Sequence, residues 1–161
     1  NKLMNNSSPV ALKYLGGLYD KIGQFDDALN TYKTLIAVNT DPEALYFIGL
    51  LYNKKQEYAQ AILYLDSCLQ YTPDYLPALK HKAIAHVNLK QNEEAIATCE
   101  RILKLDPNYV KAYTYLGFAY SNMLNYPKAI EYLEKALSLA PGDAESQNML
   151  NVLYGITGKS K

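Results

Sequence analysis

The strongest constraint on how this 161-residue chain folds is a sequence pattern that returns every 33 or 34 residues. The pattern is anchored by an alanine in four similar local sequences: Ala28, Ala61, Ala95 and Ala129. A small residue and a ring precede each alanine at near-constant spacing: Gly16, Gly49, Ala83 and Gly117, then Tyr19, Tyr52, His86 and Tyr120, with Tyr154 continuing the second series. Proline closes three of the periods, at Pro73, Pro107 and Pro141. A period of this length is typical of stacked repeats, in which each unit packs only on its neighbours.

Each period contains two segments of about fourteen residues whose apolar positions have helical spacing. In the second period the first segment carries Leu45, Ile48 and Leu51, and the second carries Ile62 and Leu65. A glycine in a helix interior costs about 1 kcal/mol relative to alanine, so a recurring glycine needs a structural reason. We infer that this glycine faces the small alanine of the second helix, so that the two helices pack closely. Turns between the helices are predicted at 22–24, 55–57, 90–91 and 124–125.

This pattern resembles the tetratricopeptide repeat, whose signature combines a large residue, Leu-Gly, Tyr, Ala, an aromatic or large apolar residue and a closing Pro. The resemblance implies an all-α fold, a right-handed superhelical solenoid of antiparallel helix pairs. It divides the chain into a flexible tail (1–8), four repeats (9–41, 42–75, 76–109 and 110–143), and a capping helix or truncated fifth repeat with a polar tail (144–161). In this last segment Leu150, Leu153 and Tyr154 are expected to dock on the fourth repeat, and Gln147, Asn148 and Asn151 to face solvent.

The third repeat departs most from the pattern. Lys82, Ala83, His86 and Asn92 stand where the family has Leu, Gly, Tyr and an aromatic residue. We therefore expect this repeat to be the least stable one, or the one specialised for a ligand.

The first helix of each pair would face the concave side of such a stack, and its positions not used in packing would line that surface. Large apolar side chains are predicted there as a stripe: Tyr14, Tyr46, Phe47, Leu50, Ile84, Tyr115 and Phe118. Polar side chains accompany the stripe: Asn53, Asn88, Asn122, Lys13, Lys80, Lys111 and His81. Thr114 is predicted on the same concave surface. Exposed apolar patches mark interaction surfaces, and asparagine amides bond to peptide backbones. The alternative is that these large residues bridge adjacent repeats and are half-buried.

Composition argues against several function classes. The 16 basic and 16 acidic residues cancel, and Arg101 is the single arginine, so nucleic acid is not an expected partner. The longest apolar stretch, 44–52, is far shorter than the roughly 18 residues of a membrane span, so no direct membrane insertion is expected. Cys68 and Cys99 are predicted to be buried thiols, which favours a reducing, cytoplasmic setting.

No catalytic, metal or cofactor site is predicted. His81 and His86 lie five residues apart, which does not place two ligands on one helical face, and no third ligand accompanies them. We therefore expect a non-enzymatic protein-interaction module that holds a mildly acidic segment with aromatic or aliphatic anchors in its concave groove, as an adaptor, scaffold or targeting chaperone. The competing hypothesis is self-association into a homo-oligomer through the groove or the terminal repeats.

Overall fold

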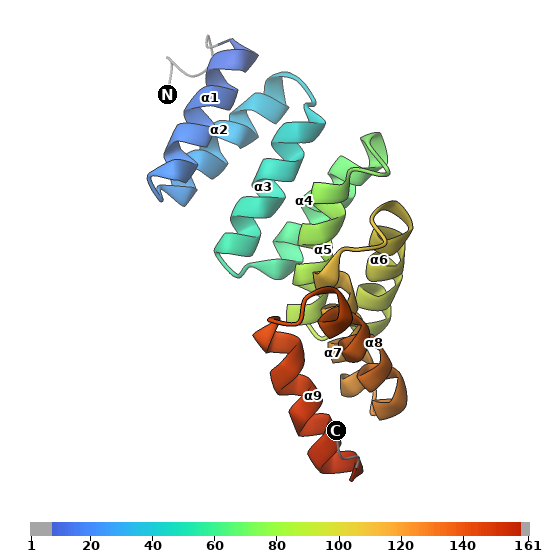
Figure 1. Cartoon of the computed structure of the whole chain (residues 1–161). Helices are drawn as coiled ribbons and strands as arrows, with labels where there is room; N and C mark the ends of the chain where they lie inside the picture. The colour runs from blue at the N-terminus through green and yellow to red at the C-terminus, as the bar shows by residue number, and fades with distance from the viewer. Residues whose placement is uncertain (1–7, 159–161) are drawn as a thin grey trace. The chain divides into compact units, whose positions relative to one another are not determined.

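The computed structural model describes residues 8–158, and within this range the chain forms nine α-helices and no strand (Figure 1). The helices are α1 (Pro9–Lys21), α2 (Phe25–Val38), α3 (Pro42–Lys54), α4 (Tyr58–Tyr71), α5 (Leu76–Asn88), α6 (Asn92–Leu105), α7 (Val110–Asn122), α8 (Tyr126–Leu139) and α9 (Ala144–Thr157). The predicted all-α repeat fold is therefore confirmed.

The chain consists of two compact units, one ending at His81 and the other beginning at Lys82. The first contains α1 to α4 and the start of α5, and the second contains the rest of α5 and α6 to α9. Most of the predicted tail at 1–8 and the end of the predicted polar tail, 159–161, lie outside the described residues. Ser8 is described, and its hydroxyl caps α1 by accepting a hydrogen bond from the backbone N–H of Ala11 at 3.2 Å.

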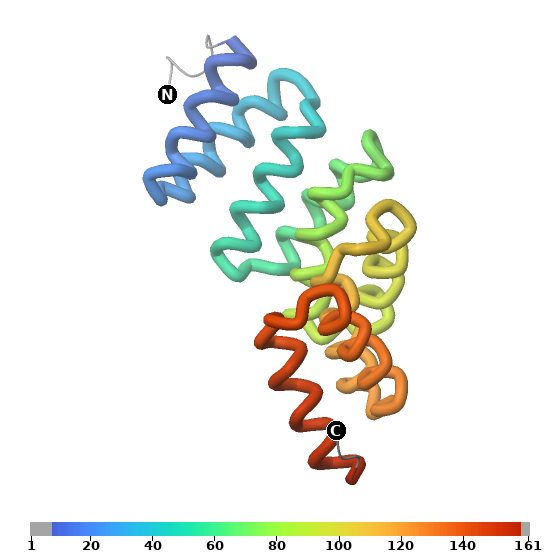
Figure 2. The backbone as a smooth tube through the Cα atoms, in the orientation of Figure 1, coloured from blue at the N-terminus to red at the C-terminus, as the bar shows by residue number. Residues whose placement is uncertain are grey.

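Short turns close the helix pairs, as Figure 2 shows for α1 with α2 and for α3 with α4. One residue of each turn has a left-handed backbone, and these residues are Gly23, Gln56, Lys90 and Leu124, with φ of 78°, 61°, 56° and 60°. A left-handed residue stops the helix and reverses the chain. Each of the four predicted turns is present, to within one residue.

The recurring glycine does permit close helix packing, and at Gly49 the expected alanine is a neighbour, because the backbone carbonyl of Ala61 would lie 3.2 Å from an added Cβ atom. A large side chain lies closer still. A Cβ atom at Gly49 would lie 2.6 Å from Cγ of Leu65, and one at Gly117 would lie 2.5 Å from Cγ of Leu133. These leucines come four residues after the recurring alanine, which is itself fully buried in both pairs. The glycine therefore makes room for a large side chain one helical turn beyond the alanine.

The C-terminal unit has its own apolar core. Leu150 and Leu153 of α9 are buried against Ala129, Ile130 and Leu133 of α8, as the sequence predicted. The hydroxyl of Tyr154 donates to Oε1 of Glu134 at 2.6 Å. Part of the exposed side of α9 is polar, where Nε2 of Gln147 donates to Oδ1 of Asn151 at 2.9 Å.

The third predicted repeat keeps the packing positions despite its unusual residues. Ala83 is fully buried where other repeats have glycine. His86 is buried where they have tyrosine, and its Nδ1 lies 2.8 Å from Oε1 of Gln91. The stability of this repeat relative to the others stays a prediction.

Candidate functional site

The N-terminal unit carries a groove of about 900 Å³ between α1 and α3. Three of the predicted site residues line this groove: Lys13 and Tyr14 from α1, and Phe47 from α3. Gly17 and Tyr32 line it as well. The groove lies along the first helices of two successive pairs, which is where the sequence placed the binding surface.

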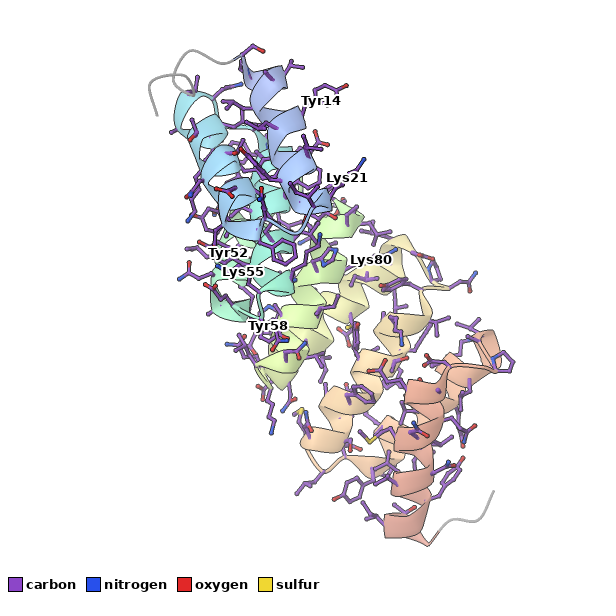
Figure 3. The ribbon with its side chains drawn as sticks, turned by 90° about the vertical axis from the view of Figure 1, so that its left-hand side faces the viewer. Tyr14, Lys21, Tyr52, Lys55, Tyr58 and Lys80 are labelled. Carbon is purple, nitrogen blue, oxygen red and sulfur yellow. The ribbon has the colours of Figure 1, made fainter. Side chains whose placement is uncertain are left out.

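Exposed apolar side chains from α1 form one border of the groove. Tyr14 is 79% exposed, and Val10 and Leu18, one helical turn before and after it, are exposed too. Figure 3 shows Tyr14 and Lys21 projecting outward from α1. Large apolar groups exposed side by side are unusual in a soluble domain and mark an interaction surface. Leu18 was not in the predicted site.

The α3 border is built from stacked rings. Phe47 stacks on Tyr32 with ring centroids 5.3 Å apart, and it lies 5.2 Å from Tyr46. Tyr46 in turn meets the rings of Tyr75 at 5.2 Å and His81 at 5.9 Å. These contacts leave Tyr46 and Phe47 half-buried, so they fix the wall of the groove rather than project into solvent.

The predicted apolar stripe is therefore exposed at one position only. Tyr14 projects into solvent, whereas the other six members are half-buried: Tyr46, Phe47, Leu50, Ile84, Tyr115 and Phe118. Phe118 packs on the core formed by α8 and α9, and burial raises the pKa of Tyr115 to about 12. These six positions have the partial burial that the alternative expectation describes. Their part in binding stays a prediction.

Two of the three lysines predicted to give the groove positive charge, Lys13 and Lys111, form ion pairs within the chain. Nζ of Lys13 lies 2.6 Å from Oε2 of Glu43 and 2.8 Å from Oδ2 of Asp41. Burial raises the pKa of Asp41 by disfavouring its charged form. The hydrogen bonds from Lys13 and from the backbone N–H groups of Glu43 and Ala44 lower it by a larger amount, so the pKa of Asp41 is lowered overall. The positive charge predicted for Lys13 is therefore balanced by two carboxylates at the start of α3, Asp41 and Glu43.

An equivalent ion-pair cluster occurs in the C-terminal unit. Nζ of Lys111 lies 2.6 Å from Oε2 of Glu145 and 3.1 Å from Oδ1 of Asp143. Thr114, expected on the concave surface, is instead fully buried, and its hydroxyl donates to Oδ2 of Asp143 at 3.1 Å. The prediction for Thr114 was wrong because Asp143, at the start of the following helix, and Ser146 enclose its short side chain.

The three predicted asparagines already donate hydrogen bonds within the chain. Nδ2 of Asn53 donates to the backbone carbonyl of His81, Asn88 to that of Ile84, and Asn122 to Oδ1 of Asn92, at 2.8, 2.8 and 3.1 Å. Asn53 thereby joins α3 to α5. The structure gives these amides a structural role that the sequence did not predict, because each partner lies on another turn or another helix.

Lys80 and His81 of α5 are both half-buried. Burial, helped by the nearby charge of Lys54, lowers the pKa of His81. The ring therefore stays neutral at physiological pH and packs beside Tyr46.

The described residues contain little that suggests chemistry. Between residues 8 and 158 no group of three or more His, Cys, Asp or Glu side chains could hold a metal ion. Cys68 and Cys99 are free and buried, as predicted, and burial raises the pKa of both thiols, that of Cys99 to about 12. Over the same residues, every helix is too short or too polar to cross a membrane.

Comparisons with known proteins agree with the repeat pattern. Two family models, both described as tetratricopeptide repeat, match residues 15–75 and 81–153. No curated protein matches the chain.

Solved structures share the fold at low sequence identity. MamA from Desulfovibrio magneticus RS-1, residue 41 to its end, is 24% identical with a TM-score of 0.89, covering 93% of this chain and 85% of that one. Another MamA crystal structure is 26% identical with a TM-score of 0.85, covering 89% and 85%. YrrB, described as a TPR protein with an unusual peptide-binding site, is 19% identical with a TM-score of 0.82, covering 88% and 73%. Together with the family models, these structures identify the fold as a stack of helical repeats. The chain belongs to the tetratricopeptide repeat family of protein-interaction modules.

Proposed function

We propose that the N-terminal unit binds an extended segment of a partner protein in the groove along α1 and α3, so that the chain acts as an adaptor, scaffold or chaperone-like protein. The observation that carries this proposal is the exposure of Tyr14, flanked by Val10 and Leu18, beside a groove of about 900 Å³. Covering each such side chain on binding contributes about 1.5–3 kcal/mol at most. YrrB, which shares the fold, is described as having a peptide-binding site, and this supports a peptide as the ligand class.

The predicted binding residues take different parts in this proposal. Tyr14 makes direct contact with the ligand, Phe47 forms the wall, and Lys13 holds the edge of the groove through its ion pairs. The remaining positions in the first unit support the wall, and these are Tyr46, Leu50, Asn53, Lys80 and His81. The matching positions of the second unit are proposed as a further contact surface: Ile84, Asn88, Lys111, Tyr115, Phe118 and Asn122.

An array of synthetic peptides of about twelve residues, with neutral apolar, acidic and basic members, tests this function. Peptides that bind the wild-type chain are measured again with Tyr14→Ala and with Tyr71→Ala. Tyr71 is a matched control because it is also an exposed tyrosine, at 59%, but lies on α4 outside the groove. We expect Tyr14→Ala to weaken binding about tenfold or more, and Tyr71→Ala to leave it unchanged. Equal losses in the two variants, or no loss in either, would contradict the proposal.

A second candidate function, self-association, is favoured by a separate observation. Val152 and Ile156 are both exposed and lie one turn apart on α9, where they form a small apolar surface. The two substitutions Val152→Ser and Ile156→Ser test it by light scattering at two protein concentrations. A mass that rises with concentration in the wild type and not in the double variant would support assembly through α9.

A further inference from the structure

The floor of the groove in the N-terminal unit contains a tyrosine that is almost fully buried and whose hydroxyl forms no hydrogen bond within residues 8–158. Tyr32 of α2 is 2% exposed, yet it is one of the residues that line the groove. Its ring passes under the glycine pair of α1: a Cβ atom at Gly16 would lie 2.7 Å from Cζ of Tyr32, and one at Gly17 would lie 3.6 Å from its hydroxyl oxygen. The hydroxyl therefore reaches the groove through the gap that Gly17 leaves.

The repeat pattern shows that this arrangement is particular to the first helix pair. The positions equivalent to Tyr32 in the other three pairs are Leu65, Cys99 and Leu133, which are fully buried. The positions equivalent to Gly17 are Leu50, Ile84 and Phe118, all of which are large. In the first pair a polar side chain thus replaces an apolar one, and the large residue that would cover it is missing.

The hydroxyl of Tyr32 has no hydrogen-bond partner among residues 8–158. Burial, with smaller contributions from Asp20 and Glu43, raises the pKa of Tyr32 to about 12. The group therefore keeps its proton at neutral pH and is available as a donor. The hydroxyl is not sealed off from the groove, because Asn53 Oδ1 is the buried side-chain atom without a partner in the described part of the chain. A polar group that opens on a groove and has no partner within the chain is placed to bond with whatever fills the groove.

The charges around the groove identify the kind of ligand. Lys13 pairs with Asp41 and Glu43, and Asp20 pairs with Lys54. These groups are satisfied within the chain, and Lys21, which also lines the groove, is exposed and projects outward from α1 (Figure 3). The floor of the groove therefore favours an uncharged ligand segment over an acidic or a basic one. An extended peptide offers such a ligand, because its backbone carbonyls are free acceptors.

We propose that the Tyr32 hydroxyl is the donor through which the groove binds a backbone carbonyl of an uncharged, extended peptide segment, with an apolar side chain of that segment against Tyr14. This inference rests on the proposed function that the groove binds a peptide. The occupant to which the proposal commits is a partner protein, because residues 8–158 are helices joined by short turns and offer no extended apolar segment that this part of a second copy could place in the groove.

The test uses the neutral apolar peptide that binds best in the array, with acidic and basic peptides from the same array for comparison. Dissociation constants are measured for the wild type, Tyr32→Phe, Gly17→Ala and the double variant. Tyr52→Phe is the matched control, because its hydroxyl already bonds Nζ of Lys33 at 2.8 Å and Tyr52 does not line the groove. Melting temperatures are recorded for every variant, and sedimentation of the free chain reports its oligomeric state.

We expect Tyr32→Phe to weaken peptide binding about three- to tenfold, while its melting temperature does not fall, because no hydrogen bond within the chain is lost. Gly17→Ala should weaken binding to a similar extent by covering the hydroxyl, and the double variant should be no weaker than Tyr32→Phe. Tyr52→Phe should bind like the wild type.

Other results would overturn the inference in distinguishable ways. If Tyr14→Ala loses binding but Tyr32→Phe stays within twofold of the wild type, the groove function stands and the role of the hydroxyl falls. If neither variant loses binding, both fall. A preference for charged peptides would overturn the ligand class, and a dimer that Tyr14→Ala dissociates would make a second copy the occupant.

Discussion

Single residues set how closely the two helices of a pair approach. At Gly49 the space for a side chain is already taken by Leu65 and by the backbone carbonyl of Ala61, which would lie 2.6 and 3.2 Å from an added Cβ. We expect Gly49→Ala to lower the free energy of unfolding by about 1–3 kcal/mol, since overpacking outweighs the gain in helix propensity. Gly155→Ala on α9 is the control: nothing lies within 4 Å, so it should raise stability by up to about 1 kcal/mol. Urea unfolding measures both, and a stabilised Gly49→Ala chain would contradict this packing.

A single histidine also gives the stability a pH dependence. The pKa of His81 is lowered in the folded chain by burial and by Lys54, so below its ordinary value of 6.5 the unfolded chain takes up the proton first. The stability that His81 contributes is therefore complete above pH 6.5 and falls as pH drops toward the folded pKa. His81→Gln should remove this part of the pH dependence, while His86 remains in both proteins. Urea midpoints between pH 7.5 and 5 test it, and parallel curves for the two proteins would show that the prediction is wrong.

The turns between helices carry strain that can be relieved at the level of the element. Leu124 has a φ of 60° and is 71% exposed, so its side chain gains little from burial while its backbone is left-handed. Leu124→Gly should stabilise the chain by up to about 1 kcal/mol, because glycine adopts this conformation without a steric cost. The neighbouring Met123 has a φ of −83°, and Met123→Gly should be neutral or destabilising. Thermal unfolding compares the two, and a less stable Leu124→Gly chain would contradict this account.

The helices and their turns could be predicted from the sequence because the same apolar spacing occurs in all four repeats. The side-chain pairings of the candidate site could not be predicted in full, because most of them join residues from different helices. Lys13 has the position of a groove cation, and the fold shows that Asp41 pairs with it as well as Glu43. The unusual pair of Gly17 and Tyr32 was visible in the repeat alignment, but its meaning depends on the hydroxyl lying under the glycine.

For the whole molecule, balanced charge affects behaviour in solution. The chain has equal numbers of acidic and basic residues and a pI near 6.9, so electrostatic repulsion between copies is weakest close to neutral pH. We expect light scattering at constant ionic strength to show more association at pH 7 than at pH 9. The same association at both pH values would mean that the apolar surfaces at Tyr14 and Val152, rather than the charge balance, control it.

The central claim is that the groove of the N-terminal unit receives a peptide, and mapping amide chemical shifts by NMR tests it most directly. On addition of the array-selected peptide, the largest shifts should occur at residues that line the groove, above all Tyr14, Gly17 and Phe47. Amides of α4 near Tyr71, outside the groove, should change little. Shifts confined to α4 or to α9, with α1 and α3 unchanged, would contradict the account.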